Sequence, residues 1–203
     1  MNGIRHWVWL PLVLAAAPAQ AHSPVPGIEG FYIGLLHPFS TPAQAVLMVG
    51  LSLLAGGFTI AAVRWVLVGF LIASLAGLAL GPLVAALDLL TFAAAFAACA
   101  LAALAPGQLA GLAVVVATIG GYLIGEVSIP DDGPTRDRLI TMSGSIVGAN
   151  VGLLYLFGIN HVIRERFTWP WVDIAFRVAA AWLGASSTRG FVSVSGLTTQ
   201  APK

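Results

Sequence analysis

Long, uninterrupted apolar runs dominate the sequence, and short polar or Pro- and Gly-containing stretches separate them. Each run has about 17–21 residues, the length that a helix needs to cross the ~30 Å hydrocarbon core of a bilayer. The runs show no alternation of period two, so they predict helices rather than the strands of a barrel. Six spans are expected, at residues 42–62, 65–84, 87–104, 108–125, 139–158 and 171–187.

The composition supports a membrane protein. Of the 203 residues, 59% are hydrophobic and 8% are charged, whereas a soluble domain has about 45–50% apolar and about 25% charged residues. The net charge is +1 and the basic residues are scattered, which excludes a nucleic-acid-binding face. The single cysteine, Cys99, excludes an intramolecular disulfide and a multi-thiolate metal site. The expected fold class is all-α, a polytopic bundle of six transmembrane helices.

The first 21 residues have the features of a secretory signal peptide. Arg5 precedes an apolar core at 7–17, and Ala19-Gln20-Ala21 fits the small-x-small rule for cleavage. An uncleaved signal anchor is the alternative, but the apolar core is too short to span a bilayer comfortably. Cleavage would leave His22 at the periplasmic N-terminus, where its α-amine and imidazole could together chelate a transition metal.

This leader sets the expected organisation of the chain in the bacterial inner membrane. A signal peptide (1–21) precedes a periplasmic segment (22–41), a six-helix transmembrane domain (42–187) and a flexible periplasmic tail (188–203). The tail is expected to be flexible because it is rich in Ser, Thr and Gly.

Small residues recur at four-residue spacing in two of the spans, and such ridges allow helix backbones to approach closely. Close packing is the favoured interpretation, and a glycine-lined permeation path is the alternative. The ridges are Gly69, Ala73, Gly77 and Gly81 in the second span, and Gly144, Gly148 and Gly152 in the fifth.

Polar groups inside a bilayer are costly, so they are the first candidates for function. Four potential metal ligands fall near the predicted periplasmic level: His22, His37, Asp88 and Glu126. Imidazole and carboxylate groups suit divalent transition metals. The alternative is that polar residues simply collect at helix ends.

Three further residues are candidates for a transport path. Gln44 lies in the first turn of the first span, and Met48 follows one turn later with a soft thioether. Asn150 lies near the middle of the fifth span, where it either forms an interhelical hydrogen bond or provides a polar step for a cargo.

Other motifs are either structural or absent. Asp173 and Arg177 stand four residues apart on the last span and are expected to form an ion pair. The sequence has no GxSxG, HExxH or Walker A motif and no paired catalytic carboxylates, so no enzyme is expected.

Several of these residues resemble the HupE/UreJ family of small bacterial inner-membrane proteins, which are associated with hydrogenase and urease and regarded as nickel permeases or accessory proteins. The similarity rests on the leader, His22, Gly30-Phe31-Tyr32-Ile33-Gly34-Leu35-Leu36-His37-Pro38, Asn150-x-Gly152, and Trp171 followed by residues 174–182. In the family's metal motif, His-Pro is followed by Asp-His and then a Met. His37, Pro38 and Met48 fit this frame, but Ala43 and Gln44 replace Asp-His.

The resemblance implies a permease or metal-delivery protein for a divalent transition metal, Ni²⁺ first, which is carried rather than permanently bound. Its expected partners are the lipid bilayer, the metal ion and metalloenzyme maturation proteins. The alternative is a membrane accessory or scaffold protein that transports nothing, because the Asp-His pair is missing.

Overall fold

A computed structural model describes residues 29–81, 83, 86–130 and 134–196 of the chain. Every regular element among them is an α-helix, in agreement with the predicted all-α class. The predicted leader (1–21) and His22 lie outside the described residues. The helices are α2 (Glu29–Ser40), α3 (Pro42–Ala55), α4 (Ile60–Leu80), α5 (Leu87–Leu104), α6 (Ala110–Val127), α7 (Thr135–Arg166) and α8 (Pro170–Val194).

Four of the described helices, α4 to α7, are long and apolar enough to cross a membrane. A fifth candidate appears when α2 and α3, which meet at an angle of 73°, are taken together as one broken span. Helix α8 does not reach the same apolarity, since it carries Asp173, Arg177 and Arg189. By length and composition, these apolar helices are compatible with a membrane protein.

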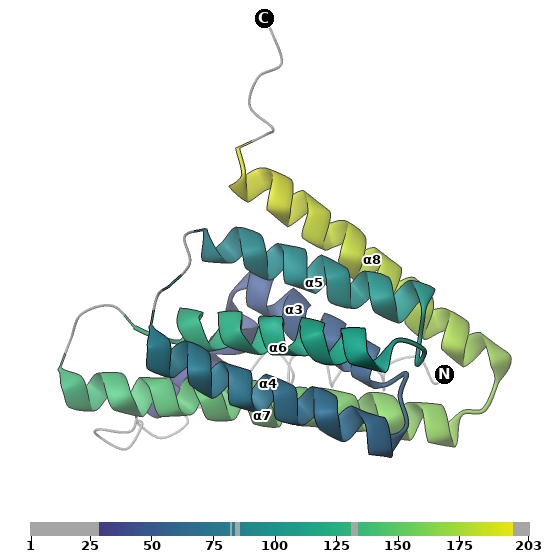
Figure 1. Ribbon diagram of the computed structural model, residues 1–203, viewed down its shortest axis with the longest axis horizontal. Helices are drawn as coiled ribbons and strands as arrows, with labels where there is room; N and C mark the ends of the chain where they lie inside the picture. The colour runs from purple at the N-terminus through teal and green to yellow at the C-terminus, as the bar shows by residue number, and fades with distance from the viewer. Residues whose placement is uncertain (1–28, 82, 84–85, 131–133, 197–203) are drawn as a thin grey trace, which may run out of the picture.

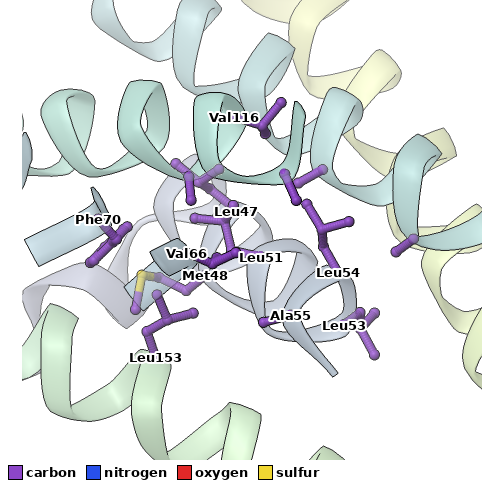
Figure 2. Packing of buried hydrophobic residues seen from close by; sticks show 14 of the residues in the cluster. Leu47, Met48, Leu51, Leu53, Leu54, Ala55, Val66, Phe70, Val116 and Leu153 are labelled. Atoms are coloured by element: carbon purple, nitrogen blue, oxygen red, sulfur yellow. The ribbon is translucent and has the colours of Figure 1, made fainter. Parts of the chain in front are cut away.

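The long helices run side by side along the molecule, and α3 lies among them (Figure 1). Helix α3 contacts α2, α5, α6, α7 and α8. Its residues Leu47, Met48 and Leu51 are fully buried and cluster with Phe70 of α4 and Leu153 of α7 (Figure 2). The short helix α3 is therefore the centre of the apolar core.

Two helix pairs pack backbone to backbone through glycine. Between α2 and α7, a Cβ at Gly34 would collide with the carbonyl of Thr141, and one at Gly148 with that of Leu35. Between α4 and α6, a Cβ at Gly77 would collide with the carbonyl of Tyr122. The two helices of each pair are parallel, because successive contacts advance toward the C-terminal end of both helices. The predicted close approach of backbones is confirmed at Gly77, Gly144 and Gly148, whereas Gly69 and Gly152 lie against side chains. Gly81 ends α4 with φ +75°, and no atom of the described residues lies within 4 Å of a Cβ placed there.

The predicted boundary between the first two spans, at residues 62–65, is wrong. Helix α3 ends at Ala55, and α4 already begins at Ile60. The reason is the pair Gly56-Gly57, which turns the chain where Gly57 lies against the backbone of Gly107. Any larger residue at position 57 would obstruct that approach.

Other elements are more helical than predicted. The expected periplasmic segment contains α2, and α7 extends the predicted fifth span in both directions to 32 residues. Helix α8 continues to Val194, so the predicted flexible tail is helical where it begins. Only the third predicted span, 87–104, coincides with its helix, α5.

Candidate functional site

The centre of the candidate site is the break between α2 and α3. Pro38 lies inside α2 and has no N–H to donate to the helix. Pro42 then forces the preceding Thr41 into an extended conformation (φ −102°, ψ 135°) and takes the first position of α3. Pro38 thus removes a hydrogen bond from the last turns of α2, and Pro42, four residues later, starts α3 after a bend of 73°.

The break lies beside the middle of α7. Leu35 packs on Gly148, and the ring of Phe39 occupies the space beside Gly152. These positions are roughly half-way along α7. Since α7 is long enough to cross a bilayer, the break falls inside the bundle rather than at its end.

His37 and Gln44 meet across the break. The side-chain amide Nε2 of Gln44 lies 3.5 Å from the imidazole Nε2 of His37, at the long limit for a hydrogen bond. Gln44 is 2% exposed, so its polar atoms are shielded from solvent. The predicted candidates His37 and Gln44 therefore belong to one local site.

Three buried oxygen atoms near the break have no hydrogen-bond partner among the described residues: Thr41 Oγ1, Gln44 Oε1 and Ser145 Oγ. Thr41 is the residue at the bend, and the backbone of Ser145 packs on α2 at Gly34, one turn before His37. An unsatisfied buried oxygen costs about 1–3 kcal/mol. Three such oxygens at one break call for a partner, such as a water molecule or an ion.

Met48 and Asn150 have defined structural contacts. Met48 is fully buried in the core, one turn from Gln44 (Figure 2). Asn150 Nδ2 donates to Ser74 Oγ at 3.1 Å and to the carbonyl of Ile146 at 3.0 Å. The interhelical hydrogen bond predicted for Asn150 is confirmed, and it joins α7 to α4.

Asp88 and Glu126 lie at helix ends. Asp88 is exposed in the first turn of α5. Glu126 is 3% exposed near the end of α6, and its Oε1 accepts the backbone N–H of Leu83 at 2.7 Å. Glu126 thereby holds the connection that follows α4. In the part of the chain described, no three His, Cys, Asp or Glu residues are grouped to hold a metal ion.

Several polar residues at the break are not among the sequence candidates. Thr41 and Ser145 are two of them, although the sequence Pro38-Phe39-Ser40-Thr41-Pro42 carries a signal for a helix break. A second interhelical bond, from Asn160 Nδ2 to Ser52 Oγ at 3.1 Å, joins α7 to α3.

The predicted Asp173–Arg177 ion pair was wrong. Asp173 Oδ1 instead lies 2.6 Å from Nη1 of Arg164, near the end of α7. Arg177 Nε donates to the carbonyl of Ala103 at 2.8 Å. The two residues find partners on neighbouring helices, which the spacing within one helix could not reveal.

Comparison of the chain with protein-family models, with curated proteins and with solved structures found no match. The resemblance to the HupE/UreJ family therefore stays a prediction, and so do the metal and transport roles of the candidate residues.

Proposed function

We propose that this chain is an inner-membrane permease or metal-delivery protein for a divalent transition metal, with Ni²⁺ as the first candidate. The observation that carries the proposal is the break between α2 and α3. It combines an imidazole, a buried amide and unsatisfied oxygen atoms beside the middle of α7. Broken helices within a bundle are a recurrent way to build a substrate site at membrane depth.

The donor set at the break suits a passing cation. His37 offers a neutral imidazole nitrogen, and Gln44 offers an amide oxygen that has no partner among the described residues. Nickel accepts nitrogen and oxygen donors of this kind. The C-terminal end of α2 adds the negative end of a helix dipole at the same place. With few protein ligands, the ion would keep part of its hydration shell and could leave again, as conduction requires.

The remaining candidates extend this site into a route. His22, at the proposed processed N-terminus, would capture the metal in the periplasm, with Asp88 and Glu126 as further ligands on the same side. Met48 follows Gln44 along α3, and Asn150 provides an amide on α7. These assignments rest on the sequence pattern and on the positions of the residues along their helices.

The proposed topology has six spans, with the mature N-terminus and the C-terminal tail in the periplasm and the leader removed. Helices α2 and α3 form the first, broken span, α4 to α7 form the next four, and α8 forms the sixth. The charged residues of α8 support this assignment, because Arg164 pairs with Asp173 and the carbonyl of Ala103 accepts from Arg177. Paired charges lower the cost of insertion.

A non-transporting accessory protein is the second candidate, and the glycine contacts favour it. Backbone packing at Gly34, Gly148, Gly77 and Gly125 leaves little freedom for the helices to move. Such a rigid bundle would serve to hold a partner for metalloenzyme maturation.

Uptake of radioactive nickel by proteoliposomes containing the full-length protein distinguishes the two functions. We expect vesicles with the wild-type protein to accumulate nickel. The His37→Ala variant should lower the rate of uptake at least tenfold. His161→Ala is the matched control, because His161 pairs with Glu165 at 3.1 Å and stacks on Phe157 away from the break. Equal uptake by wild-type vesicles and protein-free vesicles would reject the permease.

A further inference from the structure

A second polar and aromatic site lies where α7 ends and α8 begins. A cavity of about 410 Å³ opens there between the two helices. Its walls are almost entirely apolar, with Ile163 and Phe167 from the α7 side and Trp171, Ala175 and Phe176 from α8. This cavity is separate from the break between α2 and α3, and its lining includes none of the proposed transport residues.

Aromatic rings form a continuous exposed surface at the mouth of the cavity. The ring centroids of Phe167 and Trp169 are 5.9 Å apart, and those of Trp169 and Trp171 are 5.7 Å apart. Trp169 and Trp171 are 57% and 58% exposed. Tryptophans at the ends of apolar helices lie at the level of the lipid headgroups. The cavity therefore extends from headgroup level toward the acyl chains.

Two arginines lie at this end of α7, and one of them, Arg164, is paired with an acidic residue. Arg164 lies 4.3 Å above the ring of Phe176, a wall of the cavity, and pairs with Asp173 through Nη1. Its Nε is buried and has no hydrogen-bond partner among the described residues. Arg166 is exposed in the last turn of α7 and forms no ion pair with any residue in the described ranges. The exposed Arg166 at the end of α7 is thus the donor available to an anion near this apolar cavity.

We propose that this cavity binds an anionic phospholipid of the surrounding leaflet. One acyl chain lies along Ala175 and Phe176, and the phosphate is held by the exposed guanidinium group of Arg166. Basic pockets between transmembrane helices recognise anionic lipids by this combination of charge and apolar surface. The site is independent of the proposed metal transport and requires only that α7 and α8 are embedded in a bilayer.

Native mass spectrometry of the full-length protein, with phosphatidylglycerol or phosphatidylcholine added, tests the proposal. We expect the wild-type protein to retain phosphatidylglycerol in preference to phosphatidylcholine. Arg166→Gln should lower retention of phosphatidylglycerol about fivefold, since one basic side chain near an anionic lipid contributes on this scale. Arg189→Gln is the matched control, because Arg189 is also an exposed arginine but lies near the other end of α8.

A second variant tests the cavity without changing the charge. Ala175→Phe fills the space for the acyl chain, so it should lower the retention of both lipids, whereas Arg166→Gln affects only the anionic one. Ala175 is exposed, so the larger side chain does not disturb the core. Equal losses in Arg166→Gln and Arg189→Gln, unchanged retention in Ala175→Phe, or displacement of the lipid by inorganic phosphate would each overturn the proposal.

Discussion

The helix pairs α2–α7 and α4–α6 pack through the same kind of glycine contact, yet they differ in the polar groups that they bury. In α4, Ser74 Oγ donates to the carbonyl of Leu71 and accepts from Asn150, so the polar atom is satisfied. Helix α2 stops at Ser40, and the oxygens of Thr41 and Gln44 beyond it have no partner among the described residues. The first pair surrounds a break between two helices, whereas both helices of the second pair are continuous, although the buried hydroxyl of Tyr122 in α6 also has no hydrogen-bond partner among the described residues.

This difference shows how a broken helix can be held in place. A helix of 12 residues such as α2 is marginal on its own. The close backbone contact at Gly34, Gly144 and Gly148 fixes it against the much longer α7. Helix α2 can therefore end inside the bundle while its contacts with α7 keep it in place.

The largest expected effect comes from adding a methyl group to either glycine contact. Gly144→Ala and Gly125→Ala should each lower the free energy of unfolding by about 3 kcal/mol, because the new Cβ collides with the carbonyl of Phe31 or Ser74. Unfolding in mixed detergent measures the change. Gly158→Ala is the control, since no atom in the described part of the chain lies within 4 Å of a Cβ at that position, and this variant should gain up to about 1 kcal/mol of stability. A Gly144→Ala variant as stable as this control would show that α2 is not docked on α7.

Gln44→Leu should separate stability from function. Removing the unpartnered amide oxygen should raise the free energy of unfolding by about 2 kcal/mol, while nickel uptake is lost. Gln108→Leu, at an exposed position between α5 and α6, should change neither quantity. If Gln44→Leu both destabilises the protein and leaves uptake intact, the amide is a structural group and not part of a cargo site.

The two interhelical asparagines provide a smaller and sharper comparison. Asn150→Leu and Asn160→Leu each remove one bond to a serine on another helix, so each should cost roughly 1 kcal/mol of stability. Only Asn150→Leu should also slow uptake, because Asn150 is the proposed polar step. Unfolding and nickel uptake are measured for both variants. If both variants lose uptake, the loss results from altered helix packing and not from a polar step at Asn150.

The smallest effect is expected at the charged end of α8. Asp173→Asn should lower the free energy of unfolding by no more than about 0.5 kcal/mol, because Asp173 is 72% exposed and exposed ion pairs contribute little. The same unfolding assay in detergent applies. A loss several times larger would mean that the Arg164–Asp173 pair is shielded from water and holds α7 to α8.

The sequence predicted the helical class and the glycine ridges because both depend on local patterns. Helix α5 was predicted with its observed bounds, since a Gly-Pro pair precedes it and Ala105-Pro106-Gly107 follows it. Gly144 and Gly148 were expected to pack because only small residues allow backbones to touch. Both features can be predicted without knowing which helix packs against which.

The site was only partly predictable because it depends on contacts between helices. The sequence identifies His37, Gln44 and Asn150 as polar groups in apolar surroundings. It does not predict that two prolines break the first span and bring His37 close to Gln44. Ser145 has no distinguishing sequence signal and becomes notable only through its burial beside α2. The partner of Asp173 is likewise fixed by the turn from α7 to α8.

The most direct test of the polar break as a cargo site is calorimetric titration of Ni²⁺ into the purified full-length protein. The account predicts saturable binding by the wild-type protein and by His161→Ala, and a loss of at least tenfold in affinity for His37→Ala and Gln44→Leu. Wild-type affinity in both break variants would contradict it.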